Sequence, residues 1–286
     1  MGSNTGEDMV TETALTLQNG ATLHVYDTGP ADGFPVVWHH GTPNIGAPPE
    51  PLFGAATRLG LRFVAYDRPG YGGSTPRPDR PVASAAFDVL ALADALELDH
   101  YSVLGHSGGS PHALASAALH PDRVVAAVSI AGLAPFTVGG LEWFAGMYAG
   151  GQATLRAAAA GRAAKEAYEA TEPPFDPQMF TPADHAALNG PWSWLNAVVG
   201  PAMQSGPAPL IDDDLAYVRP WGFDPADIRV PVLLLHGLHD RVVPATHSEW
   251  LAHHIPRAEL RLTPDDGHLS ILNHAESALE WIAART

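Results

Sequence analysis

The clearest candidate for chemistry is Ser107, which stands in the stretch LGHSGGS at residues 104–110. A serine hydroxyl becomes a nucleophile when a base takes its proton and the oxygen projects into the open. A sharp turn from strand to helix projects the oxygen, but it requires very small residues two before and two after the serine. Gly105 and Gly109 meet this requirement. The pattern therefore predicts a nucleophilic serine between a buried strand and a helix.

A carboxylate and a histidine follow Ser107 in the order that such chemistry can use. Asp240 comes just beyond the apolar run of VPVLLLHGLHDRVVP, and a carboxylate at a strand end can hold one histidine tautomer. His268 lies in DDGHLSIL, on a loop expected at the start of the last helix. Asp265 and Asp266 are alternative acids, but their closeness to His268 favours turn or N-cap roles. We predict the set Ser107, Asp240 and His268.

Two backbone N–H groups are candidates for stabilising a developing oxyanion. Gly108 begins the helix after the serine, where N–H groups favour negative charge. Thr42 follows the apolar strand of VVWHHGTPNIG, and Pro43 after it shapes the turn without offering a donor. His106 has two open interpretations, since it could line the pocket or pack beside the turn.

An alternating pattern of strands and helices must position these residues. The chain opens with a hairpin signal at Asn19-Gly20, and the clearest helical pattern covers residues 82–98. Such alternation predicts an α/β fold with a mostly parallel, doubly wound sheet. The expected strands are 13–17, 21–26, 36–38, 63–66, 101–104, 124–130, 232–235 and 259–262.

The alternation stops between about residues 134 and 226, where aromatic residues and helix formers collect. We expect a helical cap at 134–226, inserted into a core made of 1–133 and 227–286. Residues 153–170 predict a plain solvated helix with the i,i+4 pairs Arg162/Glu166 and Lys165/Glu169. The acidic residues of the region are also expected to be solvated: Glu142, Glu166, Glu169, Glu172, Asp212, Asp213 and Asp214.

Composition excludes several classes of partner. The formal net charge of -16, with 15 Lys and Arg, argues against nucleic acid and anionic membranes and favours a small-molecule substrate. The sequence has no cysteine, so no disulfide or thiolate metal site is expected, and a reducing cytoplasm fits best. Adjacent histidines such as His39 and His40 point to opposite faces of a strand, so no metal is expected. Residues 1–10 do not have the pattern of a signal peptide.

These motifs together resemble the α/β-hydrolase superfamily over nearly the whole chain. The stretch AYDRPGYGGSTPRP at residues 65–78 is similar to the family's Asp-x-x-Gly-x-Gly-x-Ser turn, and the insertion lies where the family usually carries a lid. The resemblance implies the α/β-hydrolase fold, with Ser107 as nucleophile, His268 as general base and acid, and Asp240 as the orienting carboxylate. It also implies that the N–H groups of Thr42 and Gly108 form the oxyanion hole.

The expected activity is hydrolysis of a small, largely apolar carboxylic ester through an acyl-enzyme, with no cofactor. Serine at position 107 excludes the family branches that use an aspartate nucleophile. Three alternatives stay open. The first is aminopeptidase or amidase activity like that of proline iminopeptidases, the second is a cofactor-free perhydrolase or haloperoxidase, and the third is a ligand-binding protein of the same fold without turnover.

Overall fold

A computed structural model describes residues 10–136, 138–204 and 206–286. The expectation about a signal peptide concerns residues 1–10, of which the first nine lie outside this description. In the described part, eight strands form one sheet in the order β1-β2-β4-β3-β5-β6-β7-β8. The strands are β1 (Thr11–Thr16), β2 (Thr22–Asp27), β3 (Phe34–His39), β4 (Leu61–Tyr66), β5 (Tyr101–His106), β6 (Val124–Ile130), β7 (Val232–Gly237) and β8 (Ala258–Thr263).

Strand directions agree with the predicted mostly parallel sheet. The pairs β1–β2 and β2–β4 are antiparallel, and every pair from β4 to β8 is parallel. The predicted hairpin is present, with Gly20 at a φ of 83° in the turn between β1 and β2. The apolar run from residue 124 forms the buried strand β6. No helix in the described residues has both the length and the apolar character needed to cross a membrane.

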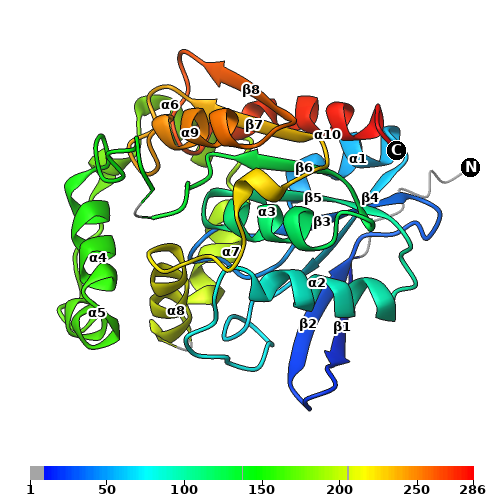
Figure 1. The fold of residues 1–286 in the computed structure, drawn as a ribbon, viewed down its shortest axis with the longest axis horizontal. Helices are drawn as coiled ribbons and strands as arrows, with labels where there is room; N and C mark the ends of the chain where they lie inside the picture. The colour runs from blue at the N-terminus through cyan, green and yellow to red at the C-terminus, as the bar shows by residue number, and fades with distance from the viewer. Residues whose placement is uncertain (1–9, 137, 205) are drawn as a thin grey trace, which may run out of the picture.

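Helices cover both faces of the sheet (Figure 1). Successive residues of a strand point to opposite faces, so Leu233 and Leu235 join one apolar cluster while Val232 and Leu234 join another. The first cluster includes α1 and α10, and the second includes α2, α3 and α9. The core helices are α1 (Phe53–Arg58), α2 (Ser84–Ala95), α3 (Ser110–Leu119), α9 (Thr246–His254) and α10 (Ala275–Ala283).

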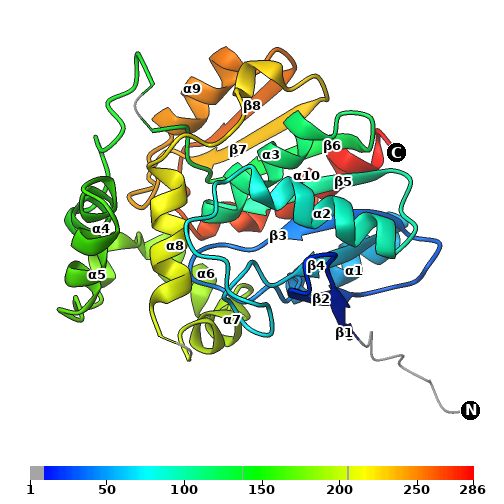
Figure 2. The ribbon, with the colours of Figure 1, turned by 60° about the horizontal axis from the view of Figure 1, so that its bottom comes forward.

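Between β6 and β7 the chain forms the predicted helical insertion. Figures 1 and 2 show α4 and α5 farthest from the sheet, with α8 between them and the core. We keep residues 134–226 as a proposed cap and 1–133 with 227–286 as the proposed core. The helices of the insertion are α4 (Ala149–Ala159), α5 (Arg162–Glu169), α6 (Pro182–Leu188), α7 (Leu195–Ala202) and α8 (Ala208–Tyr217).

The single helix expected over residues 153–170 is wrong. The segment is split into α4 and α5, because Gly161 adopts a φ of 109° that no right-handed helix contains. A glycine reaches this backbone conformation without steric cost. The alanines on both sides favour helix, so the composition of the segment concealed the break.

Candidate functional site

Ser107 lies at the turn between β5 and α3 that its neighbours predict. It begins a short 3₁₀ turn (Ser107–Gly109) and has a φ of 53°, a strained value for a residue with a side chain. A Cβ on Gly105 would lie 2.5 Å from the carbonyl oxygen of Gly109, and one on Gly109 would lie 2.0 Å from that of His39. Both glycines are therefore required by the close packing of strand and helix.

The structure brings Ser107, His268 and Asp240 together from three separate loops. His268 Nε2 lies 2.9 Å from Ser107 Oγ, and His268 Nδ1 lies 2.7 Å from Asp240 Oδ2. Asp240 follows β7, and His268 precedes the 3₁₀ turn Ser270–His274. In this geometry His268 can donate from Nδ1 to the carboxylate while Nε2 accepts the serine proton.

The environment of Asp240 keeps its carboxylate ionised and oriented. Its Oδ1 accepts from the backbone N–H groups of Val242 and Val243 at 2.8 and 2.9 Å. Its Oδ2 also lies 3.2 Å from His236 Nε2. Burial would raise the pKa of Asp240, but His268 and the bond with His236 hold that pKa below its usual value.

Asp240 in turn changes the proton affinity of the histidine. Burial would lower the pKa of His268, but the charge and hydrogen bond of Asp240 hold it above its usual value. The alternative acid Asp266 contacts a different histidine, since its Oδ2 lies 2.9 Å from His274 Nε2. His106 packs beside His268, because its Nε2 lies 3.1 Å from the His268 carbonyl oxygen.

The residues that carry the two predicted oxyanion donors are neighbours. Tyr217 of α8 joins them, because its hydroxyl lies 2.7 Å from Thr42 Oγ1 and donates to the carbonyl oxygen of Gly108 at 2.9 Å. A Cβ on Gly108 would lie 2.3 Å from the Tyr217 hydroxyl. Burial raises the pKa of Tyr217, so the phenol keeps the proton that it donates.

A buried ion cluster lies behind the loop of Thr42. Asp213 of α8 accepts from Thr42 Oγ1 at 2.6 Å, and its carboxylate pairs with Arg68 at 2.7 Å and Arg80 at 2.5 Å. The Arg68 guanidinium also donates to the carbonyl oxygens of His40 and Gly41. Burial would raise the pKa of Asp213, but the two arginines hold it well below its usual value. The helix α8 of the insertion is thus linked by charged groups to the loop of Thr42, which carries one of the predicted oxyanion donors.

The expectation that the acidic residues of the cap are solvated is wrong for α8. Asp212, Asp213 and Asp214 are all buried. Asp214 lies 2.6 Å from the ammonium of Lys165, which also lies 2.5 Å from Glu169. Lys165 itself is buried, although its i,i+4 pair with Glu169 forms as predicted. Lys165 therefore links α5 to α8 through Asp214 and to α4 through a hydrogen bond to Thr154.

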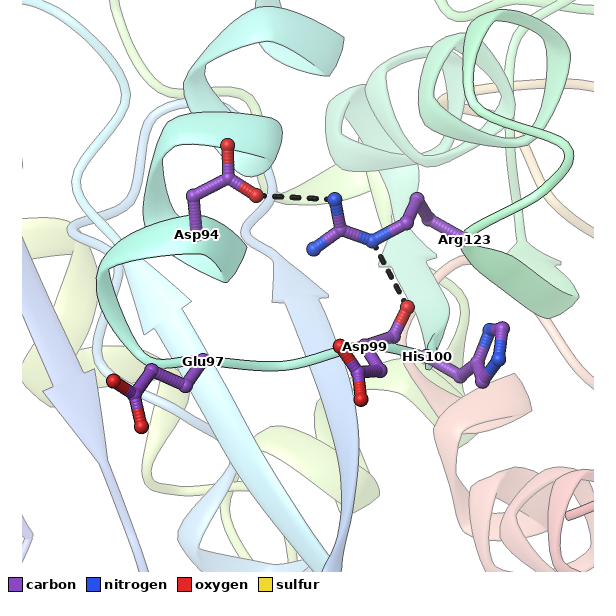
Figure 3. Close-up of a pocket in the computed structure, with 5 residues that line it drawn as sticks. All are labelled: Asp94, Glu97, Asp99, His100 and Arg123. Carbon is purple, nitrogen blue, oxygen red and sulfur yellow. Dashed lines mark hydrogen bonds and ion pairs between the residues drawn. The ribbon is translucent and has the colours of Figure 1, made fainter.

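A surface crevice drawn in Figure 3 lies away from these residues. His100 directly precedes β5 and Arg123 directly precedes β6, so the crevice opens at the amino ends of strands whose carboxyl ends approach Ser107. Arg123 donates to Asp94 Oδ1 at 3.0 Å and to the Asp99 carbonyl oxygen at 2.9 Å. Among the residues that the structure describes, no three His, Asp or Glu side chains converge as metal ligands.

Sequence reasoning gave no place near Ser107 and His268 to Arg68, Tyr217 or Asp184, and it placed Asp213 in solvent; Asp184 accepts from the backbone N–H groups of Leu269 and Ser270, next to His268. Arg68 directly follows Asp67 of the turn motif, so its position next to the site could have been inferred. Asp213 and Tyr217 are four apart and share one face of α8, yet no signal in the sequence shows what that face contacts. Asp184 is recognisable only as part of the capping pattern that starts at Thr181.

Comparisons with known proteins place the whole chain among proteins of one fold. A family model described as alpha/beta hydrolase fold matches residues 35–275. The chain is 31% identical over 235 residues to a non-heme chloroperoxidase from Streptomyces lividans, across 80% of this chain and 83% of that protein. A solved hydrolase from Pseudomonas aeruginosa PA01 aligns with a TM-score of 0.70 and 23% identity, across 98% of both chains.

Two further relatives are named for different activities. A pimeloyl-(acyl-carrier protein) methyl ester esterase from Aromatoleum aromaticum is 31% identical over 274 residues, across 89% of this chain and 92% of that protein. A proline iminopeptidase from Arabidopsis thaliana is 28% identical over 296 residues, across 89% of this chain and 74% of that protein. Because relatives of similar sequence identity are named for different substrates, the substrate of this chain depends on the residues of its own site.

Proposed function

The chain belongs to the alpha/beta hydrolase fold family, and from that premise we propose that it is a serine hydrolase of small, largely apolar carboxylic esters. The observation that carries the proposal is the hydrogen-bonded series Ser107, His268 and Asp240, with distances of 2.9 and 2.7 Å. A serine, a histidine and a carboxylate in this order and geometry are suited to acyl transfer.

The proposed reaction has two halves. His268 Nε2 takes the Ser107 proton while Oγ attacks the ester carbonyl, and the resulting oxyanion accepts from the N–H groups of Thr42 and Gly108. His268 then protonates the departing alcohol, which leaves an acyl-enzyme. Water, deprotonated by the same His268, attacks the acyl group and releases the acid. Asp240 stabilises the imidazolium in both halves.

The charges of the cap favour an ester over a peptide with a free amino terminus. Capture of a substrate ammonium needs an unpaired carboxylate over the site. The buried carboxylates of α8 are already paired inside the chain: Asp212 with Arg162, Asp213 with Arg68 and Arg80, and Asp214 with Lys165. Glu142 and Glu172 are exposed to solvent. The methyl ester esterase from Aromatoleum aromaticum supports the same substrate class.

A second candidate function is a cofactor-free perhydrolase or haloperoxidase. The similarity to the non-heme chloroperoxidase from Streptomyces lividans favours it. The same three residues would then form a peracid, because hydrogen peroxide in place of water attacks the acyl group. Activity that requires both peroxide and a carboxylic acid separates this function from ester hydrolysis.

Labelling with a fluorophosphonate tests the proposal. Wild-type protein should gain one label on Ser107, as measured by intact mass and peptide mapping, while Ser107→Ala and His268→Ala should gain none. Ser116→Ala is the matched control, because Ser116 lies in α3 and is fully buried, so its loss should leave labelling unchanged. Folded wild-type protein that takes no label would contradict the proposal. If the label is found on Ser107, the activity of the unlabelled enzyme is then measured on a panel of acyl esters and aminoacyl arylamides.

A further inference from the structure

Asp184 belongs to the cap helix α6, yet its carboxylate is bonded to the loop of His268. Its Oδ1 accepts from the backbone N–H of Leu269 at 2.7 Å and from that of Ser270 at 2.8 Å. These are the two residues that directly follow His268. The Asp184 side chain is completely buried. A carboxylate 84 residues away in the chain therefore satisfies two donors beside the predicted base.

The second oxygen of the carboxylate is fixed by the start of its own helix. Its Oδ2 accepts from the backbone N–H and from the hydroxyl of Thr181, both at 2.9 Å, which completes a capping box. Burial would raise the pKa of Asp184, but hydrogen bonds from Ser270, Thr181 and Leu269 hold it below its usual value. The carboxylate is thus ionised and held in one orientation by four donors.

The residue before His268 is also shaped around this carboxylate. A Cβ on Gly267 would lie 2.1 Å from Asp184 Oδ2, so only glycine permits the approach. The Gly267 N–H donates to Ser270 Oγ at 2.8 Å, which closes the loop around His268. The loop is therefore held before His268 by the hydrogen bond from Gly267 to Ser270, and after His268 by the hydrogen bonds to Asp184.

We propose that Asp184 is a positioning residue, which fixes the His268 loop so that the cap determines where the base stands relative to Ser107. This inference rests on the function proposed above. Asp184 touches no reacting atom, so it acts through His268 alone. The His268 imidazole must stay within hydrogen-bond reach of both Ser107 and Asp240, and a displacement of about 1 Å can cost about 100-fold in rate.

The charges around His268 make the role measurable. Asp240 faces Nδ1, Ser107 faces Nε2, the ring of His106 packs at 5.2 Å between centroids, and His236 lies beyond Asp240. Burial lowers the pKa of His106 to about 3, so this neighbour is neutral during catalysis. The negative charges that raise the pKa of His268 are those of Asp240 and Asp184. Removal of the Asp184 charge should lower that pKa.

The test compares Asp184→Asn with wild type in the pH dependence of kcat/KM for p-nitrophenyl acetate. We expect a loss of about 10- to 100-fold at the plateau, carried by kcat, and an acid limb displaced to lower pH. Asp176→Asn is the matched control, since Asp176 is an exposed N-cap in the same insertion and should leave both quantities unchanged. A folded Asp184→Asn variant with the wild-type plateau and acid limb would overturn the inference.

Two further measurements keep the test decisive. If Asp184→Asn does not fold, Thr181→Val keeps the charge and removes one of the bonds that orient it, so kcat should fall while the acid limb stays in place. A wild-type kcat in Thr181→Val would then refute positioning. NMR titration of the His268 ring in wild type and Asp184→Asn needs no turnover, so an inactive wild type contradicts the proposed function while the titration still tests the inference.

Discussion

The predicted catalytic edge of the core and the interior of the cap both bury charge, but they do so in different ways. At the edge of the core, Asp240 is held by two histidines and two backbone N–H groups, which come from β7, from the loop after it and from the loop of His268. In the cap, Asp213 is held between Arg68 and Arg80, far from it in sequence. Strand ends place side chains by local rules, whereas helix packing places them by contacts made at long range.

The largest effect is expected at the predicted catalytic edge of the core. His268→Ala should lower kcat/KM for an ester by about 10⁴-fold or more, because no other group takes the serine proton. Steady-state kinetics on p-nitrophenyl acetate measures the loss, and the thermal midpoint of unfolding should change little. Residual activity within tenfold of wild type would mean that His268 is not the base.

The next largest effect is expected inside the cap. Asp213→Ala should lower the free energy of unfolding by about 3–5 kcal/mol, because two buried guanidinium groups lose their shared counter-charge. Urea denaturation measures this loss. Asp94→Ala is the matched control, since Asp94 is exposed and its ion pair with Arg123 lies at the surface (Figure 3), where such pairs contribute about 0–1 kcal/mol. Equal losses in the two variants would remove the difference between buried and surface pairs.

A smaller, pH-dependent effect is expected at Lys165. Lys165→Met leaves Asp214 and Glu169 without their ammonium and should cost about 3 kcal/mol near pH 8. Burial already raises the pKa of Asp214 against the opposing effect of Lys165, so without Lys165 that pKa rises further above its unfolded value. The variant should therefore regain stability as pH falls and the carboxyl takes up a proton.

Denaturation of Lys165→Met at pH 5 and pH 8 checks this sign. Glu166→Gln, on the exposed face of the same helix, should show the wild-type difference between the two pH values. A loss in Lys165→Met that is the same at both pH values would contradict the burial of the Asp214 carboxylate.

The smallest effect concerns the backbone of the cap. Gly161→Ala should destabilise the protein by about 1 kcal/mol, because Gly161 has a φ of 109° and the space around it is otherwise open. Gly54→Ala in α1 is the matched control, since Gly54 is exposed, has no positive φ and leaves room for a Cβ, so the substitution should be neutral or stabilising. Thermal unfolding distinguishes the two, and a stabilised Gly161→Ala would show that α4 and α5 can join.

The sequence was sufficient for the sheet and for the geometry around Ser107, because both depend on short patterns. Gly105, Gly109 and the apolar run before them predict one turn, and the chain order predicts which acid reaches His268. The same reasoning missed the interior of the cap. The three successive aspartates at 212–214 predict a solvated acidic run, because only the packing of α8 between the core and α5 supplies a cation to each of them.

Asp184 shows most clearly what a local sequence pattern can and cannot predict. Its capping pattern predicts a helix start from local hydrogen bonds, and that start forms as the pattern indicates. The other half of the same carboxylate bonds to a loop that no local pattern connects with it. When a side chain hydrogen-bonds to two segments that are far apart in the sequence, a local pattern predicts only the bonds to the nearer segment.

Lys165 is the only lysine in the sequence, and its ammonium is fully buried between α4, α5 and α8. An amine-reactive reagent therefore finds no exposed ε-amino group on the folded chain. Acylation of Lys165 requires α5 to separate from its neighbours, so the rate of modification at Lys165 measures how often α5 separates from α4 and α8. Lys165 is therefore a natural reporter of that separation and needs no engineered label.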